Sequence, residues 1–469
     1  MTNKHKITFC LLIGISVFAS SCFTGRKYER QELPAANLYR TDDVQNYEEV
    51  SMADSNTFGA LSWRQLFTDT ILQNYMAQAL ENNLDVQIAL RNIDAAAAYV
   101  KQNKAAFGPT VSASLNYSYA KNPKYTNGIT DGSLYQLGTN LSWEADIWGK
   151  IRSQKNASEA AYLQTIEAQR AITSQLIAQM ASIYYQIITL DEQIEIAHLS
   201  ILTRDSSLQT TKALMQGGQL TAVAIEQTKA QVYDAQNILL NLKKQRRVLE
   251  NAFCLLLNEP AHEIRRGSME QQIINTPLAI GVPAQLLANR PDVRQAEFAL
   301  MQALELTNVA KANFYPSLVI TAGAGFREMD IKNWLTPEGI FAQVAGGLLQ
   351  PILNRRLLKT AHEVAQTREV QALLTYQKML LIAGNEVSDA LYDYQTQNES
   401  VELQEKQYQA LKTAVNYSQQ LLVNGLANYL EVLTAQQNVL VTELNLSNTK
   451  YRRLLAIIQL YQALGGGWQ

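Results

Sequence analysis

Apolar residues recur every three or four positions over three long stretches of the chain. The runs span residues 176–201, 225–256 and 430–461, each over three or more heptads, which predicts helices that wrap around one another. Occasional polar residues at these positions, among them Thr228, Arg246, Gln437 and Ser447, indicate a partly wetted interface. No proline lies between Pro123 and Pro260 or after Pro351, so residues 150–215 are expected to form one helix of about 100 Å.

Glycine marks one turn in each half of this helical region. Gly217 and Gly218 follow the first long helix in MQGGQLTAVA, and Gly425 holds the same place in LVNGLANYLEVL. Glycine just after a helix accepts the left-handed conformation that closes a helix C-terminus. The sequence therefore predicts two long helical hairpins, at residues 150–258 and 355–464.

Four shorter segments alternate apolar with small or polar residues. They are Thr110–Tyr119, Ser133–Trp143, Leu318–Phe326 and Gly339–Leu349. A period of two predicts strands, and loops of about a dozen residues separate the members of each pair. We therefore expect two β-hairpins, at residues 110–146 and 317–350.

The segment before each β-hairpin occurs twice. NNLDVQIALRNIDAAAAYVKQNKAAFGP (82–109) and NRPDVRQAEFALMQALELTNVAKANFYP (289–316) align without a gap and share Asn, Asp-Val, two Ala, Lys-Ala, Phe and Pro. In both copies the proline ends a helix, and the alternating pattern follows it. The sequence therefore predicts two structural repeats, at 58–259 and 289–469. A linker at 260–288 joins them, and an extended segment at 22–57 precedes them.

Strands of about ten residues with one apolar face are typical of transmembrane β-barrels. Aromatic residues at the strand ends nearest the helices, namely Trp143, Trp148, Phe314 and Tyr315, suit a membrane interface. Four strands cannot close a barrel, and open edges are excluded from hydrocarbon, so several chains would have to share one barrel. Three chains would supply about twelve strands, within the known range. A soluble antiparallel sheet packed on the helices is the alternative that alternation leaves open.

The N-terminus has the pattern of an export signal. Positively charged residues at 4–6 precede an apolar stretch, Ile7–Ala19, that is too short to span a bilayer. Small residues then lead to Cys22 in ASSCF, as in a bacterial lipoprotein signal. This predicts a signal peptide at 1–21 and a lipid on Cys22. An ordinary secretory signal with a chance cysteine is the alternative.

Charge and motifs argue against nucleic-acid binding and catalysis. The 40 Lys and Arg residues nearly balance the 42 Asp and Glu residues, and no basic run stands out. His198, His262 and His362 show no metal-ligand spacing, and the sequence contains no Walker loop or G-x-S-x-G motif. Cys254, in the apolar run FCLLL, is expected to be a small core residue. We therefore expect no enzyme, no metal, no nucleic-acid partner and no cofactor beyond the lipid on Cys22.

Motifs spread over nearly all of the mature chain point to a known family. They are SWRQLFTDTILQNYMAQALENNLDVQIALRN, WEADIWGKIR, LLANRPDVRQAE, QPILNRR, NGLANYLEVLTAQ and the C-terminal LYQALGGGW. In this order they resemble the TolC-like outer-membrane efflux factors, specifically the lipoprotein (NodT-type) branch that serves RND-type pumps. RPDVxxAE and LGGGW are specific to that branch.

The resemblance implies a mixed α and transmembrane β fold with an internal two-fold repeat. Each chain would supply four strands to a trimeric twelve-stranded β-barrel, and its coiled-coil hairpins to a periplasmic α-barrel. Small or polar residues would line the barrel interior: Ser112, Ser114, Asn116, Gln136, Asn140, Ser142, Thr321 and Gly323.

By the same resemblance the hairpin tips would contact a periplasmic adaptor and form a gate. Adaptor contacts are expected at Gly217, Gly218, Gly425 and Leu426, where plain helix capping is the alternative. Helical hairpins with glycine turns can tighten or splay like an iris. The candidate gate residues are Ala427, Asn428, Tyr429 and Glu431.

The gate departs from the family pattern at one position. Family members often carry an acidic residue just before the Asn-Tyr pair, where this chain has Ala427, so Glu431 is the nearest acid. Three copies of Glu431 around an axis would form a ring that attracts cations. Coiled-coil packing of Tyr429 and a solvated helix face for Glu431 are the alternatives.

The function that these observations favour is the exit channel of a tripartite efflux pump, which passively conducts small toxic solutes across the outer membrane. Its partners would be two further copies of the chain, a periplasmic membrane-fusion adaptor, an inner-membrane RND transporter and outer-membrane lipid. One alternative is a type I secretion duct for polypeptides, against which the lipoprotein signal and the RPDV motif argue. The other is a lipid-anchored periplasmic coiled-coil scaffold, against which the four alternating segments argue.

Overall fold

The computed structural model describes residues 25–30, 48–50, 58–121, 132–272, 279–281 and 290–468. The predicted signal peptide, Cys22 and most of the segment at 22–57 lie outside the described residues, as does most of 273–289. The chain divides into two compact units. Unit 1 comprises Met1–Gln31, Asn92–Ile166 and Gln295–Gln377, and unit 2 comprises Glu32–Arg91, Glu167–Arg294 and Lys378–Gln469. Each unit therefore draws on both sequence repeats.

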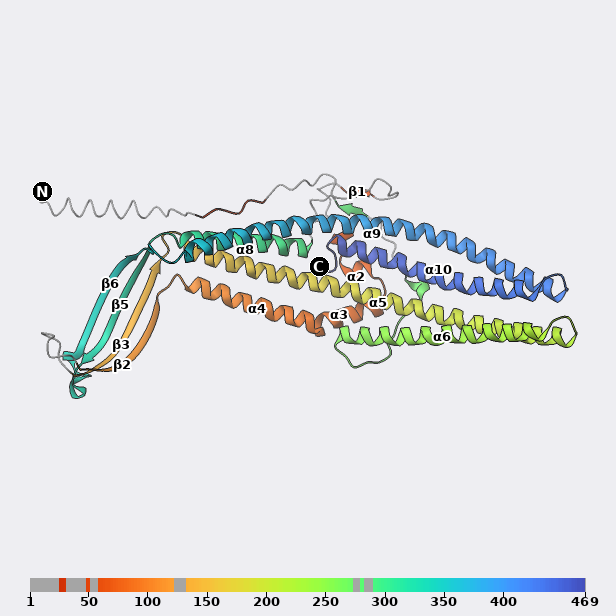
Figure 1. Ribbon diagram of the computed structural model, residues 1–469, viewed down its shortest axis with the longest axis horizontal. Coiled ribbons are helices and arrows are strands. Elements are labelled where there is room, and N and C mark those ends of the chain that lie inside the picture. The colour runs from red at the N-terminus through yellow and green to blue at the C-terminus, as the bar shows by residue number, and fades with distance from the viewer. Residues whose placement is uncertain are drawn as a thin grey trace. The chain divides into compact units, whose positions relative to one another are not determined.

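Long helices and four long strands make up most of the described chain (Figure 1). The first half contains α2 (Trp63–Leu66), α3 (Thr70–Asn82), α4 (Leu84–Ala105), β2 (Thr110–Ala120), β3 (Gly132–Ala145), α5 (Lys150–Gln216) and α6 (Ala222–Leu257). The second half contains α8 (Pro291–Ala312), β5 (Ser317–Glu328), β6 (Ile340–Leu349), α9 (Leu357–Val423) and α10 (Tyr429–Ala463). Within the described ranges, no helix combines the length and the hydropathy needed to cross a bilayer.

Equivalent elements of the two halves are a constant distance apart in the sequence. The first residues of α5 and α9, Lys150 and Leu357, are 207 positions apart (357 minus 150), as are those of α6 and α10, Ala222 and Tyr429 (429 minus 222). Both α5 and α9 contain 67 residues. The duplicated segments 82–109 and 289–316 have the same offset, so the predicted internal repeat extends through both helical hairpins.

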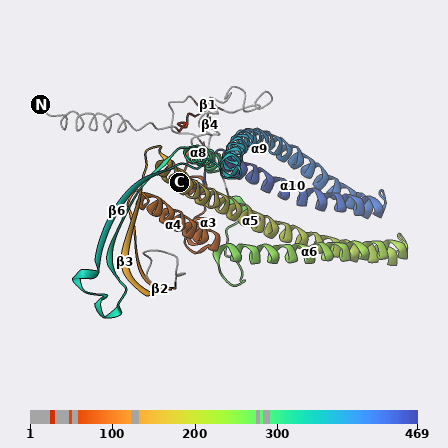
Figure 2. The same ribbon diagram turned by 60° about the vertical axis from the view of Figure 1, so that its left-hand side comes forward.

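The four strands of unit 1 form one antiparallel sheet in the order β2-β3-β5-β6, shown from two directions in Figure 1 and Figure 2. The four strands predicted from alternation are thereby confirmed. Ser112, Asn140, Gly323 and Gln343 stand opposite one another across the sheet. Because side chains alternate along a strand, this row lies on the face that carries the expected pore-lining residues. The other face carries an apolar row in which Leu115, Leu137, Phe326 and Ile340 stand opposite one another.

A matched pair of hydrogen bonds closes the helix-to-strand junction in each half. The Trp143 indole Nε1 donates to the carbonyl of Phe107 at 2.8 Å, and the Gln350 amide Nε2 donates to the carbonyl of Phe314 at 2.9 Å. Trp143 and Gln350 are equivalent positions of the repeat. Each satisfies a carbonyl just beyond a helix end, where no intrahelical donor is available. The junction geometry is thus preserved although the donor side chain differs.

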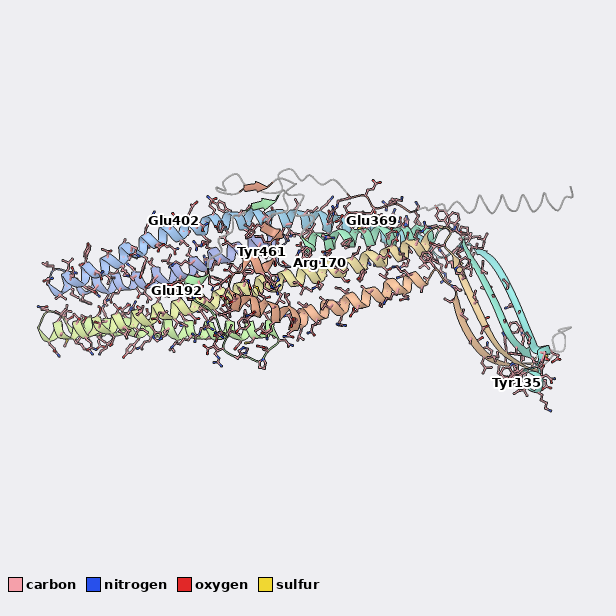
Figure 3. All side chains as sticks on the ribbon, turned by 180° about the vertical axis from the view of Figure 1, so that it is seen from behind. Tyr135, Arg170, Glu192, Glu369, Glu402 and Tyr461 are labelled. Carbon is pink, nitrogen blue, oxygen red and sulfur yellow. The ribbon has the colours of Figure 1, made fainter. Side chains whose placement is uncertain are left out.

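The core of unit 2 is aromatic and built around Tyr461, labelled in Figure 3. The Phe67 and Tyr461 rings meet edge to face with centroids 6.3 Å apart, and both side chains are at most 1% exposed. The Tyr461 hydroxyl donates to the carbonyl of Leu61 at 2.6 Å. A Cβ at Gly466 would lie 2.2 Å from the Tyr461 ring, so the LGGGW motif needs glycine there to fold over the core. Cys254 is 1% exposed in the same core, as expected.

The RPDVxxAE motif also has a structural role. Arg290 is 6% exposed and binds Asp292, Glu386 and the carbonyl of Ala463, with Nη1 to the Glu386 carboxylate at 2.6 Å. Each of these partners belongs to unit 2. Arg290 therefore ties the start of α8 to α9 and to the C-terminal end of α10.

A short parallel pairing lies within unit 2 that the hydrophobic pattern does not predict. β1 (Glu48–Val50) pairs with β4 (Ala279–Gly281). Strands of three residues are too short to show a periodicity of two. The segments expected to be extended or linking thus contribute a small sheet.

Candidate functional site at the hairpin turns

The two helical hairpins turn through the same backbone geometry. Gly218 and Gly425 have φ of +76° and +72°, a conformation that favours glycine. Gln219 N donates to the carbonyl of Leu214 at 2.9 Å, and Leu426 N donates to that of Leu421 at 2.8 Å. These bonds close each helix in a Schellman motif. Both glycines therefore cap helices.

Residues of both turns are open to solvent. Gly217, Gly218 and Gly425 are exposed, and Leu426 is 76% exposed. An exposed leucine on a tight turn leaves a large apolar side chain without intramolecular packing. The turns are thus accessible in a single chain, as a docking surface requires.

The turn between α9 and α10 leads into α10, and three of the predicted gate residues lie in this turn and the start of α10. Asn428 caps α10, because its side-chain oxygen accepts from Leu430 N at 3.2 Å. Ala427 is half-buried and precedes this cap. Glu431 lies in the first turn of α10, where a carboxylate favours the helix dipole, and its side chain is exposed.

Tyr429 connects the two hairpins. Its hydroxyl donates to Gln227 Oε1 of α6 at 2.5 Å, so α10 is bonded to the outer hairpin, which α5 and α6 form. Tyr429 also lines a cavity of about 530 Å³ between that hairpin and the inner hairpin of α9 and α10. Neither the gate role nor the alternative of coiled-coil packing for Tyr429 includes this polar contact, because the sequence around Gln227 gives no signal of it.

The cavity between the hairpins is lined by hydroxyl and apolar side chains. Its hydroxyls come from Thr203, Ser206, Ser207, Thr210, Thr211, Thr228 and Tyr429, and its apolar walls from Leu202, Leu422, Val423, Val432 and Leu433, with Gln419 beside them. Several of these hydroxyls donate to the carbonyl four residues earlier in their own helix, as Thr211 does to Ser207 at 2.8 Å. These threonine hydroxyls therefore bind their own helix, whereas Tyr429 and Ser207 are the lining hydroxyls that bond to the facing hairpin.

A buried arginine lies next along the seam. Arg204 of α5 is 1% exposed. Its Nη1 donates to the carbonyl and side chain of Gln231 on α6, and its Nη2 to Gln437 Oε1 on α10 at 2.6 Å. Burial lowers the pKa of the guanidinium, which no carboxylate contacts directly among the described residues. Gln436 Nε2 donates to Ser207 Oγ at 2.7 Å beside it.

Further from the turns the outer hairpin closes on an apolar cluster, in which Leu190 and Ile194 of α5 pack with Leu239 and Leu242 of α6, and Leu444 of α10 packs against it. Polar bonds link α5 to α10 here, because Gln193 Nε2 donates to the carbonyl of Leu444 at 3.2 Å and Ser447 Oγ donates to Glu192 Oε2 at 2.6 Å.

Still further from the turns the seam between the hairpins is apolar, since Ile188 of α5 and Ile458 of α10 belong to one large buried cluster. Such packing excludes water. The seam therefore changes from apolar in that cluster to polar and hollow at the turns, where Thr228 lines the cavity and Gln437 accepts from Arg204.

The described residues hold no cluster suited to a metal ion. No group of three or more His, Cys, Asp or Glu side chains within the described ranges could hold a metal ion. His362 is half-buried, with its ring centroid 5.7 Å from that of Phe314.

Comparison with known proteins places the chain in a family. The family model for outer membrane efflux proteins matches residues 75–259 and 282–466, that is, once in each repeat. The chain is 26% identical over 474 residues to the cation efflux system protein CusC of Escherichia coli O6:H1, covering all of both proteins. It is 29% identical over 412 residues to the solvent efflux pump outer membrane protein SrpC of Pseudomonas putida, covering 86% of this chain and 87% of that protein.

A solved structure shows the same fold. The outer-membrane channel OprN matches with a TM-score of 0.85 at 22% identity, covering 95% of this chain and 100% of that one. With two family matches in register with the repeat, four antiparallel strands and two long helical hairpins, the chain belongs to the outer membrane efflux protein family, as a non-enzymatic efflux channel of the outer membrane with a TolC-like fold.

Proposed function

We propose that this protein is the exit channel of a tripartite RND-type efflux pump. It receives small toxic solutes from a periplasmic adaptor and an inner-membrane transporter and conducts them passively to the exterior. Membership of the family supports the channel, and the relatives named for cation and for solvent efflux show that one fold serves different cargoes. Energy and selectivity then come from the partners.

Three chains close the channel. In the described sheet β2 and β6 are the edge strands, each paired on one side only. Unpaired backbone groups are not tolerated in hydrocarbon, so β2 of one copy pairs with β6 of the next. The face with Ser112, Asn140 and Gly323 turns inward as a hydrated lining, and the face with Leu115 and Leu137 meets lipid.

The lipid anchor on Cys22 is part of the proposal. Cys22 itself lies outside the described residues, but the nearby segment 25–30 is bound to α8 and α9. Arg26 pairs with Glu369 of α9 at 2.6 Å, and Arg30 pairs with Glu297 of α8, the glutamate of RPDVxxAE. A lipid attached a few residues before Arg26 would thus sit on a short tether.

The gate lies at the hairpin turns. The contacts between the two hairpins support this proposal. Apolar packing in the buried cluster that contains Ile188 of α5 and Ile458 of α10 holds the hairpins together, whereas near the turns only a few polar bonds span a cavity. Polar bonds can be exchanged for bonds to water at a net cost of about 1 kcal/mol each. The turns therefore splay while the apolar seam stays closed, and an adaptor docked at Gly217, Gly218, Gly425 and Leu426 stabilises the open form.

Single-channel conductance in planar bilayers tests the proposed function. We expect a small, cation-selective conductance from the wild type, and a loss of selectivity in Glu431→Ala if three exposed Glu431 side chains ring the constriction. Glu226→Ala is the matched control, since Glu226 is an exposed acid in the first turns of α6 that pairs with Lys229. Absence of any conductance would contradict the channel and favour the scaffold. Equal selectivity in both variants and the wild type would remove Glu431 from the gate.

A further inference from the structure

The connection between β5 and β6 is ordered by its own hydrogen bonds. Asp330 caps η3 (Ile331–Asn333) by accepting from Lys332 N at 2.9 Å. In η4 (Pro337–Gly339), Gly339 N donates to the carbonyl of Thr336 at 3.1 Å. A Cβ at Gly339 would lie 3.0 Å from the carbonyl oxygen of Trp334, so the loop is also closely packed on itself.

This ordered loop exposes three large apolar side chains. Met329, Ile331 and Leu335 are 57%, 60% and 61% exposed. Apolar side chains grouped on an ordered surface indicate an interaction site. The equivalent positions of the first repeat, 207 residues earlier, hold Asn122, Lys124 and Gly128. The apolar character is therefore a property of one loop and not of the repeat.

Aromatic rings join the loop to one face of the sheet. The Tyr117 and Tyr135 ring centroids are 5.1 Å apart, and Trp334 of the loop lies 6.1 Å from Tyr135. Figure 3 shows Tyr135 at the end of the sheet where the strands are connected by loops. Tyr117 stands opposite Tyr135, and alternation places both on the apolar face with Leu115 and Leu137. The loop thus folds toward the apolar face.

We propose that the β5–β6 loop is an anchor in the surface of the bilayer. Met329, Ile331 and Leu335 insert among lipid acyl chains, next to an aromatic belt formed by Tyr117, Tyr135 and Trp334. The proposal rests on the proposed function, in which the strands cross the outer membrane. Lipid is the occupant because the loop continues the apolar face of the sheet, and aromatic residues concentrate where a membrane surface meets water.

The length of β5 agrees with a loop at the membrane surface. β5 contains 12 residues. At roughly 3.3 Å per residue and a tilt of roughly 40°, such a strand rises about 30 Å, close to the thickness of the hydrocarbon core. The loop at its end therefore lies at the membrane surface.

Nitroxide labels report whether each site meets lipid, water or protein. Single cysteines at Ile331→Cys and Leu335→Cys are labelled, with Leu115→Cys on the apolar strand face and Ser114→Cys on the opposite face as references. Cys254 is 1% exposed, and the parent protein treated with the label gives the background. The protein is reconstituted in vesicles of phosphatidylcholine and phosphatidylglycerol. Collisions with oxygen, which partitions into lipid, are compared with collisions with a water-soluble nickel chelate.

We expect oxygen to dominate at positions 331, 335 and 115, and the nickel chelate at 114. Nickel access at 331 and 335 with oxygen access at 115 would place the loop in water and overturn this inference alone. Shielding of 331 and 335 from both reagents would mean that protein covers the loop, which also overturns it. Nickel access at 115 would overturn the membrane-spanning sheet, and the inference with it.

Tryptophan fluorescence gives a second measurement that needs no cysteine. In vesicles of brominated phosphatidylcholine, quenching of the wild type should exceed that of Trp334→Phe, because the belt residue contacts the brominated chains. Equal quenching in the two proteins would contradict contact between the loop and the lipid chains.

Discussion

The outer hairpin (α5–α6) and the inner hairpin (α9–α10) have nearly the same backbone but different polar contacts. Their first helices are of equal length, and their glycine caps have φ within 4° of each other, at +76° and +72°. Yet the side chains that connect the two hairpins differ from those at the equivalent positions of the other repeat. Arg204 is equivalent to Leu411, Tyr429 to Ala222, and Gln437 to Ala230.

The repeat and the contacts between the hairpins are preserved to different degrees. The repeat preserves what closes each hairpin, namely caps and apolar seams, because these bury apolar area and satisfy backbone groups. It does not preserve the few polar side chains through which α10 contacts α5 and α6. In the proposed gate, these links are the bonds that break when the two hairpins separate.

The largest effect is expected from Arg204→Met. Methionine fills similar volume but removes three donated bonds that join three helices, so the closed form loses its main polar link. Methionine leaves the Gln231 and Gln437 acceptors buried without a donor in the closed form, whereas water can satisfy them when the hairpins separate. We therefore expect the channel's open probability to rise about tenfold or more.

Arg246→Met is the matched control for this variant. Arg246 of α6 pairs with Asp191 of α5 at 2.9 Å, so it joins helices within the outer hairpin. We expect its open probability to equal that of the wild type. An equal rise in both variants would show that general loosening, and not the link between hairpins, controls opening.

A smaller rise is expected from Tyr429→Phe, which removes one hydroxyl bond to Gln227. One bond of about 1 kcal/mol corresponds to roughly a fivefold change in the open-to-closed ratio of one chain. Tyr408→Phe is the control, because that hydroxyl donates to Glu443 at 2.8 Å within the inner hairpin. Bilayer recordings of the two variants should differ; matching traces would argue against a role for the Tyr429 hydroxyl.

The sequence predicts an element of this fold well when its hydrophobic pattern repeats over many residues. Heptads and alternation recur for tens of residues, so the long helices, four strands and internal repeat are predictable. The helix ends at Gly218 and Gly425 are also predictable, because glycine there has a specific backbone reason. The parallel pairing of β1 with β4 is not, since three residues show no period.

The candidate site is predictable only in its location. The sequence points to the turn that carries Asn428 and Tyr429, but their chemistry depends on contacts between distant segments. Gln227 and Arg204 become significant only when α6, α5 and α10 meet, and neither belongs to a local motif. Ala427 lacks the acid that the family resemblance leads one to expect there, so the local sequence gives no charged residue to mark the candidate gate.

A weaker effect on conductance should distinguish alanine substitutions at the two glycine caps. Gly218→Ala and Gly425→Ala each force alanine into a left-handed conformation at a cost of about 1 kcal/mol, and no atom lies within 4 Å to add a clash. The local cost should therefore be equal, as hydrogen exchange at the two turns can measure. Conductance should change for Gly425→Ala and not for Gly218→Ala. A change in both would extend the gate to the outer turn.

The smallest effect is expected from the N-caps. Asn428 accepts from Leu430 N, whereas Thr221, its equivalent in the first repeat, makes no side-chain cap bond. Asn428→Ala should cost about 1 kcal/mol of local stability at the start of α10, and Thr221→Ala close to none. Amide exchange in the first turns of α6 and α10 checks this, and equal protection losses would contradict it.

The most direct test of the central claim is a double-mutant cycle on the bond between Tyr429 and Gln227, read as open probability in planar bilayers. If this bond holds the hairpins closed, Tyr429→Phe and Gln227→Leu each raise the open probability. The double variant then raises it no further than either one alone. Additive effects, or no effect from either single variant, would contradict a gate held by polar bonds from α10 to the outer hairpin.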